Sequence, residues 1–154
     1  MTVQQLHLVT FRVREQLYGV DIMQVHRVLL VRNLVHVPGA APHLRGLLEL
    51  HDQMIAVVDL MYLLRGEAAP PDAAGRPSSS HRVVVVHPAP ESLLGLDVDD
   101  VGDPIRVEAV APPPAEATVP AVAGIFTHAR ERGIMLDPTA LRAAVPAPAA
   151  PARR

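Results

Sequence analysis

The sequence predicts a mainly β protein whose short strands close into two small barrels, with a few helical turns. Apolar residues make up 49% of the chain, yet it has only two Phe, two Tyr and no Trp, so the core must consist of branched aliphatic side chains, which favour strands. Residues 81–87 form a continuous β-branched run typical of a strand covered on both faces. Turn signals indicate about eight to ten strands, and closure into barrels would remove the unpaired edges that an open sheet leaves.

Alternating apolar residues predict two further strands. The first contains Leu6, Leu8, Phe11 and Val13, and the second contains Leu94, Leu96 and Val98. We expect each of these strands to have one buried face and one face in water, and we expect residues 81–87 to be the central strand.

A short pattern occurs twice along the chain. Residues 46–59 read as a strand, a polar turn, a second strand and an Asp that opens a helical turn, and residues 124–137 repeat this order. The separation from Gly to Asp is 13 residues in both copies (59 − 46 and 137 − 124). We interpret Asp59 and Asp137 as helix N-caps, and Pro138 suits the first helical position. A chance match in an Ala- and Val-rich sequence is the alternative.

The length and the proline distribution predict one folding unit with two subdomains. A chain of 154 residues is too short for two separate cores of useful size. Pro- and Ala-rich stretches at residues 66–80, 111–121 and 145–154 are typical of loops and of a disordered end. We therefore expect a domain over residues 6–143, divided near the loop 66–80, and a disordered tail over residues 144–154.

Composition excludes several classes of protein. The formal charge is −2 and there is no Lys- or Arg-rich block, so the sequence lacks the basic surface that nucleic-acid binding requires. The absence of cysteine excludes disulfides, thiolate zinc sites and cysteine nucleophiles. We find neither a signal peptide nor about 20 consecutive apolar residues that could insert into a bilayer, and we expect a cytoplasmic protein.

We expect no catalytic residue, no cofactor and no metal. Residues 97–108 imitate a calcium loop, but Val101 replaces an oxygen ligand and the flanks alternate as strands instead of helices. The eight histidines contain no i,i+4 ligand pair. The only serine cluster, residues 78–80, lies in a Pro/Ala-rich loop that cannot hold a nucleophile, and the scattered glycines form no phosphate loop. An acid/base role for Asp59 and Asp137 is less economical than capping.

Six short motifs follow one another in a characteristic order across residues 6–143. They are Phe11-Arg-Val; Tyr18-Gly-Val-Asp-Ile22 with Val25; Val37-Pro38 through Pro42-His-Leu-Arg-Gly46; Ile55-Ala-Val-Val-Asp59-Leu60; Leu94-Gly-Leu-Asp-Val-Asp-Asp-Val101; and Gly133-Ile-Met-Leu-Asp137. Together they resemble the CheW-like family of chemotaxis coupling proteins. The resemblance implies two intertwined five-stranded SH3-like barrels and adaptor work without chemistry. It also implies that a chemoreceptor's cytoplasmic tip binds an apolar groove between the barrels, and that one barrel pairs with the regulatory domain of a CheA-type histidine kinase.

The chain departs from the family pattern at two charged positions. The family commonly has Asn-Leu-Arg-Gly where this chain has Glu49, Leu50, His51 and Asp52, and it usually has Glu where this chain has Arg27. The resemblance assigns partner contacts to Val25, Arg27, Gly46, Glu49, Leu50, His51 and Asp52. Barrel packing explains Val25, Gly46 and Leu50 equally well, and the four polar side chains could be ordinary surface.

These departures lead to two hypotheses on function. In the first, the chain is a diverged coupling adaptor that binds a receptor tip, a kinase regulatory domain or both, with one contact altered or lost, because opposed charges steer assembly. A specialised array, such as one for gliding motility, is one setting for such an adaptor. In the second, the same fold binds another signalling protein independently of the kinase.

Overall fold

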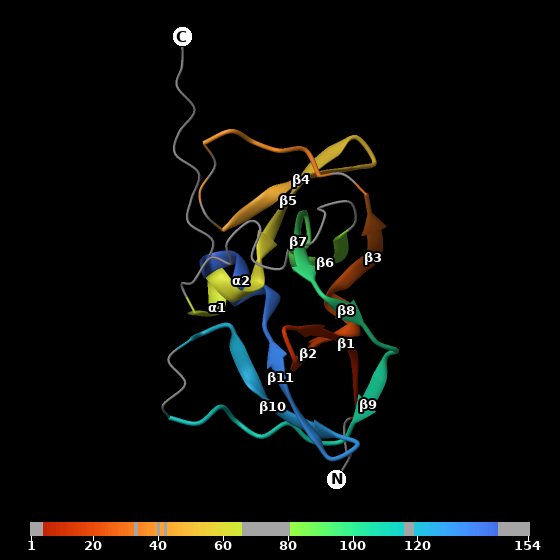
Figure 1. Ribbon diagram of the computed structural model, residues 1–154. Helices are drawn as coiled ribbons and strands as arrows, with labels where there is room; N and C mark the ends of the chain where they lie inside the picture. Colours follow the sequence, from red (N-terminus) through yellow and green to blue (C-terminus); the bar gives the residue numbers. More distant parts are fainter. Residues whose placement is uncertain are drawn as a thin grey trace.

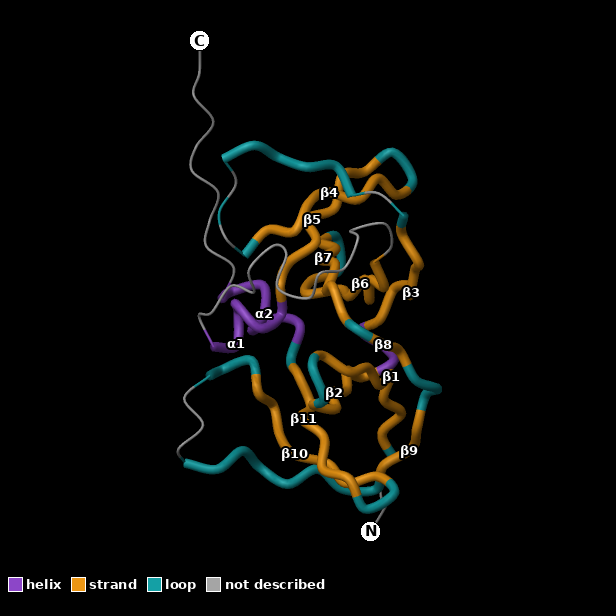
Figure 2. Tube along the Cα trace, viewed as in Figure 1, coloured by secondary structure: helices purple, strands orange, loops and turns teal. Residues whose placement is uncertain are grey.

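The computed structural model describes residues 5–32, 34–39, 41, 43–65, 81–115 and 119–144, and in this part of the chain eleven strands form two sheets (Figures 1 and 2). The two sheets lie one above the other in Figure 1, and the two short α-helices lie at one side, where the sheets approach each other. The expected mainly β architecture is therefore confirmed. The loop 66–80 and the tail from residue 145 onward lie outside the described residues.

The first sheet combines both ends of the chain. Its strand order is β10-β11-β2-β1-β8, with β9 also paired to β1. The bounds are β1 Leu6–Val13, β2 Gln16–Asp21, β8 Asp100–Val101, β9 Ile105–Val107, β10 Val122–His128 and β11 Glu131–Leu136. Neighbouring strands are antiparallel except for β2 and β11, which are parallel.

The second sheet has five strands in the order β3-β6-β7-β5-β4. The bounds are β3 Val25–Val31, β4 Leu44–Leu50, β5 Gln53–Asp59, β6 His81–Ala89 and β7 Ser92–Val98. The pair β5 and β7 is parallel and the other pairs are antiparallel. The short 3₁₀ turn η1, Ile22–Gln24, joins β2 of the first sheet to β3 of the second.

The two sheets are intertwined. The strands that precede and follow residues 66–80, β5 and β6, both belong to the second sheet, whereas β1 and β2 pair with β8, β9 and β11 from the other half of the chain. The chain changes sheet between β2 and β3 and again between β7 and β8. Each half of the sequence therefore supplies strands to both sheets. The expected subdomain boundary near residues 66–80 lies outside the described residues.

Each sheet is closed by the loop that follows its edge strand. Beyond β3, Val35 pairs with Leu47 of β4, and beyond β9, Ala111 pairs with Ile125 of β10. The expected five strands are found in the second sheet, whereas the first has six. The difference arises beside β1, where residues 102–104 separate β8 from β9, and Pro104 has no N–H with which to continue the ladder.

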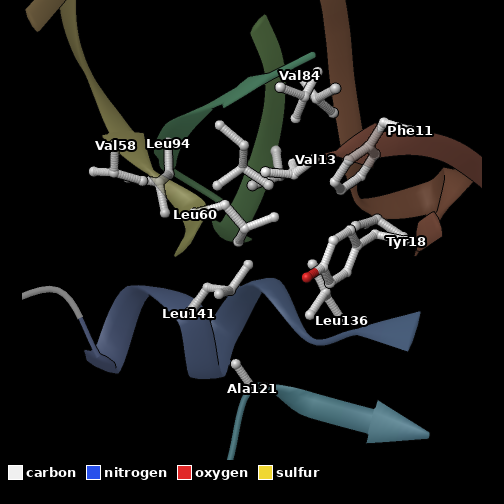
Figure 3. Close-up of a cluster of buried hydrophobic side chains, with 14 of the residues drawn as sticks. Phe11, Val13, Tyr18, Val58, Leu60, Val84, Leu94, Ala121, Leu136 and Leu141 are labelled. Carbon is white, nitrogen blue, oxygen red and sulfur yellow. The ribbon is translucent and has the colours of Figure 1, made fainter. Parts of the chain in front are cut away.

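Three apolar clusters fill the molecule. One lies within the first sheet, around Leu8 and Phe126, and a second lies within the other sheet, around Val57 and Val85. The largest lies between the sheets and includes side chains from both sheets and both helices, as Figure 3 shows: Phe11, Val13, Tyr18, Val58, Leu60, Val84, Leu94, Ala121, Leu136 and Leu141.

These clusters confirm that β6 is covered on both faces, although β7 is the central strand of its sheet, and they correct the expectation for two other strands. Val83–Val86 are all 0% exposed and point alternately into the second sheet's interior and into the cluster between the sheets. The first strand was expected to have one wet face, but Leu8 lines the first sheet's interior while Phe11 faces the opposite cluster. In β7, Leu94, Gly95 and Leu96 are likewise all buried. Curved sheets packed face to face leave their central strands no surface in water.

The repeated sequence pattern corresponds to a repeated structure. Each copy is a hairpin, β4–β5 or β10–β11, followed by a short helix: α1, Leu60–Arg65, or α2, Pro138–Ala144. The Asp59 carboxylate accepts the N–H of Met61 at 3.0 Å, and the Asp137 carboxylate accepts the N–H of Thr139 at 3.0 Å. Both bonds are of the kind that an N-cap side chain makes to the first turn of a helix.

Candidate partner-binding surface

Four of the residues assigned to partner contact lie at the tip of the β4–β5 hairpin. Leu50 pairs with Gln53, so His51 and Asp52 form a two-residue turn. Both turn residues have positive φ, 49° and 65°, which matches the twist of a hairpin but is usually supplied by Asn and Gly. His51, Asp52 and Glu49 are exposed, whereas Leu50 is half-buried against the second sheet's interior cluster.

Val25 and Arg27 lie at the start of β3, at the same end of the second sheet as this turn. Val25 pairs with Val86 near the end of β6, and β6 turns into β7 at the end where the parallel strand β5 also starts. A β-bulge lies between Val25 and Arg27. It lets Val25 pack against the cluster between the sheets while Arg27 is exposed. The structure thus brings Arg27 and the hairpin tip to one end of the sheet.

Gly46 lies away from this end and is buried within β4. A Cβ at this position would lie 2.7 Å from Leu34 Cβ and 3.0 Å from the Val35 carbonyl oxygen. Val35 is the residue whose backbone closes the sheet against β4, with hydrogen bonds of 2.8 and 2.9 Å to Leu47. The close approach of this loop explains the glycine without any partner.

Arg45, which the sequence reasoning did not single out, connects the hairpin to β7. Its guanidinium lies 3.5 Å from an Asp59 carboxylate oxygen and 3.6 Å from an Asp97 carboxylate oxygen. The side chains of Arg45, Asp59 and Asp97 are 24%, 6% and 17% exposed, so the contacts are shielded from water. Asp59 therefore has two roles, as cap of α1 and as partner of Arg45. Its position at the end of the repeated pattern indicated only the first.

His43 belongs to the same buried region. Its backbone carbonyl accepts the Asp59 N–H at 2.8 Å, and its ring lies 6.0 Å from the Tyr62 ring, measured between centroids. Burial lowers the pKa of His43 and favours the neutral imidazole. This histidine contributes to the interior of the molecule and has no access to a partner.

Exposed apolar residues of η1 and β3 form a second surface, which the sequence reasoning also missed. Met23 is 84% exposed, Leu30 66%, Val28 42% and Ile22 36%. Val28 lies directly opposite Val84 of β6, so both side chains are on the face of the second sheet that packs toward the first. We call Ile22, Met23, Val28 and Leu30 the η1–β3 surface. The apolar run from Val25 to Val31 was visible in the sequence, but only the pairing shows that β3 is an edge strand.

Neither a metal centre nor a membrane span is found in the part of the chain that the structure describes. Among residues 5–144, outside the masked stretches, no three His, Asp or Glu side chains are placed to hold a metal ion. The residues imitating a calcium loop belong instead to β7, β8 and β9. In the same residues no helix is long and apolar enough to cross a membrane.

Comparison with known proteins identifies the family. The family model described as "CheW-like domain" matches residues 7–145. The chain belongs to the CheW-like family. It is 28% identical over 117 residues to the chemotaxis protein CheW of Treponema pallidum, an alignment that covers 75% of this chain and 67% of that protein. It also resembles the crystal structure of the scaffolding protein TtCheW from Thermoanaerobacter tengcongensis, with a TM-score of 0.70 and 26% identity over 86% of this chain and 89% of that one.

This membership confirms the resemblance inferred from the six motifs. The chain is a CheW-like scaffold domain of chemotaxis signalling, in a family without catalytic function. Its two sheets, its closing loops and its short helices form the CheW fold.

Proposed function

We propose that this chain is an adaptor in a chemosensory array that binds the cytoplasmic tip of a chemoreceptor and, at a separate surface, the regulatory domain of a CheA-type histidine kinase. The observation that carries the proposal is the exposed η1–β3 surface beside the core between the two sheets. In this proposal the chain works in the cytoplasm, at receptor arrays on the membrane, and its kinase contact is altered.

The η1–β3 surface suits a helical receptor tip. An amphipathic helix binds by laying its apolar face on an apolar groove. Val28 and Leu30 are exposed on the face of the second sheet that packs toward the first, and Ile22 and Met23 are exposed on η1, which precedes β3. Complete burial of a side chain of this size contributes about 1.5–3 kcal/mol. Leu30 and Met23, the most exposed of the four, have the most area to lose to a partner.

The hairpin tip, with Arg27, suits a second protein partner. Arg27, Glu49, His51 and Asp52 are exposed polar side chains at one end of the second sheet, and Met54, which pairs with Glu49, is a 52% exposed apolar residue beside them. A mixed polar and apolar patch of this kind is typical of the rim and centre of an interface. Because the charges at positions 27 and 51 differ from the family's usual ones, we propose that the contact made here is the altered one.

Two exposed apolar residues allow the surfaces to be tested separately. We expect Leu30→Ser to weaken binding of a cognate receptor cytoplasmic fragment by at least about tenfold and to leave the kinase regulatory domain unaffected. Met54→Ser should do the reverse. Both positions are more than half exposed, so both variants should fold. Isothermal titration of each variant against each partner decides the matter: equal loss for both partners, or no loss for either, would contradict the assignment of the two surfaces.

A charge exchange tests the altered contact. Arg27→Glu combined with His51→Arg restores the charges common in the family. If those charges were what prevented pairing, this variant should bind the regulatory domain of a typical CheA-type kinase more tightly than the natural chain does. His128→Arg, at the residue before the turn of the other hairpin, is the control. No gain over this control would count against the charge explanation.

A further inference from the structure

Two histidines from different strands are in direct contact at the end of the second sheet. His26 lies in the bulge at the start of β3, and His87 lies near the end of β6. Their ring centroids are 5.0 Å apart and the rings are perpendicular. His26 is exposed and His87 is half-buried, so the pair can be reached from solvent.

The charged groups that lower the pKa of His26 are all basic. The pKa of His26 is lowered by its partial burial first, and then by the nearby charges of His87, Arg27 and His51. We call His26, Arg27, His51 and His87 the histidine cluster. It gathers side chains from β3, from β6 and from the β4–β5 turn at one exposed end of the sheet.

Acidic side chains exist on the same elements but do not neutralise the cluster. Asp21 precedes η1 and accepts the Met23 N–H at 3.0 Å, Glu49 and Asp52 lie on the β4–β5 hairpin, and Glu91 lies in the turn between β6 and β7. In the described part of the chain none of these carboxylates forms an ion pair with a member of the histidine cluster. The cluster is therefore a group of four basic side chains, one of them the charged Arg27, that an acidic partner could approach without displacing an ion pair to these carboxylates.

We propose that the histidine cluster binds a carboxylate-bearing segment of the protein partner and that this binding takes up protons. An incoming Asp or Glu would accept hydrogen bonds from the Arg27 guanidinium and from protonated imidazoles, which are charge-assisted contacts. This inference rests on the proposed partner contact at the hairpin tip and adds its chemistry: the altered contact selects an acidic partner, and acidification strengthens it.

The sign of the pH dependence follows from the two states. In the free protein desolvation and then the neighbouring bases favour neutral His26, whereas a bound carboxylate would favour the charged ring and raise its pKa. Affinity therefore rises as the pH falls through the pKa of the bound form and becomes constant below the pKa of the free form. Each proton taken up can change the dissociation constant by at most about tenfold per pH unit.

A defined acidic probe tests the cluster without any assumption about the natural partner. Proton NMR would follow the imidazole resonances of the full chain through a pH titration, with hexaglutamate and with neutral hexaglutamine. We expect hexaglutamate to raise the pKa of His26 and to shift the imidazole resonances of His87, and hexaglutamine to leave the resonances of both residues unchanged. His128, which immediately precedes the turn of the other hairpin, is the matched control and should not respond. An equal response at His128, or no response at His26, would overturn the proposal.

The second measurement is the affinity for the kinase regulatory domain at different pH values. The dissociation constant for the kinase regulatory domain should fall by about three- to tenfold between about pH 7.5 and pH 6.0, and the double substitution His26→Gln and His87→Gln should remove this gain. His128→Gln should retain it. Binding of the regulatory domain that is independent of pH would overturn the inference but leave the proposed adaptor function standing. A positive hexaglutamate result without binding of the regulatory domain would support the cluster and refute the kinase contact instead.

Discussion

The β4–β5 and β10–β11 hairpins have the same backbone but different surroundings. Each has a bulge before a glycine, Gly46 or Gly124, and each is closed by a bridge from a preceding loop. Each turn has two residues with positive φ, and each hairpin ends in an Asp that caps a helix. The side chains differ, since Asp59 is buried beside Arg45 whereas the capping bond of Asp137 is exposed to solvent.

The difference separates what the fold needs from what a particular surface needs. Bulge, glycine, closing bridge, turn and cap occur at both hairpins and therefore belong to the architecture. The ion pairs of Arg45 with Asp59 and Asp97 occur at the β4–β5 hairpin only. A feature that occurs at one hairpin only is a candidate for the specific function of that hairpin's surface.

Substitution of Gly46 or Gly124 should disturb the close approach of the closing loop that both hairpins share. Of the changes considered, it should cause the largest loss of stability. A Cβ on Gly124 would contact Val110 Cγ1 and lie 2.6 Å from the Ala111 carbonyl oxygen, and one on Gly46 would lie 2.7 Å from Leu34 Cβ. We expect Gly124→Ala to lower the free energy of unfolding by about 3 kcal/mol and Gly46→Ala by about 2 kcal/mol, measured by urea denaturation. Gly39, with φ of 72° and no atom within 4 Å of its Cβ position, is the control. Gly39→Ala should cost about 1 kcal/mol, and an equal cost at all three sites would contradict the crowding argument.

Removal of the two capping carboxylates should destabilise the protein by different amounts at the two hairpins. Asp137→Ala loses one capping bond and should cost about 1 kcal/mol. Asp59→Ala loses its cap and also one of the two carboxylates beside the largely buried Arg45, so it should cost about 2–3 kcal/mol. Chemical denaturation of both variants measures the gap. Equal losses would mean that the Arg45 contact contributes nothing to stability.

Glycine at the positive-φ turn positions of the two hairpins should raise the free energy of unfolding slightly. Asp52 and Arg130 have φ of 65° and 68°, a conformation that glycine adopts without a steric cost and that Asp tolerates better than Arg. We expect Arg130→Gly to increase the free energy of unfolding by about 0.5–1 kcal/mol and Asp52→Gly by less. Loss of stability in Arg130→Gly would show that the Arg130 side chain has a contact worth more than the turn strain.

The smallest effect should come from an ion pair that only the β10–β11 hairpin has. Arg12 donates two hydrogen bonds of 2.6 Å to the Glu131 carboxylate, and these bonds hold the pKa of Glu131 below its usual value. A lowered acid pKa stabilises the fold above the unfolded value of about 4.3, and the gain is lost as the pH falls through the folded value. Glu131→Gln should therefore lower Tm slightly near neutral pH and leave it unchanged at low pH or in about 1 M salt. Glu108→Gln, at an exposed carboxylate without an ion pair in the described residues, should leave Tm unchanged at every pH.

Local patterns in the sequence predicted much of the fold. The β-branched run at residues 81–87 belongs to β6, which is covered on both faces, and the two Gly-to-Asp patterns are the two hairpins with their capped helices. The prediction of a wet face on the first strand was wrong, because Leu8 and Phe11 face two different clusters and alternation alone cannot show that both faces are covered. Arg45 was missed for a related reason: its partners Asp59 and Asp97 lie on other strands.

The candidate partner-binding residues were predicted only as positions along the chain. Sequence reasoning could not show that Gly46 is buried under the closing loop while Arg27 and His51 share an exposed end. Nor could it find the η1–β3 surface, because an apolar run reads the same in a central strand and in an edge strand.

The sequence by itself determined the strands, the turns, the helix caps and the family, because each is set by residues that are close along the chain. The tertiary structure alone decided that β1 and β2 pair with strands from the other half of the chain, that Arg45 lies between two carboxylates, and that His26 meets His87. These contacts depend on how two curved sheets exchange strands and close. Pairing over such sequence distances depends on the packing of the whole chain, and no local pattern records it.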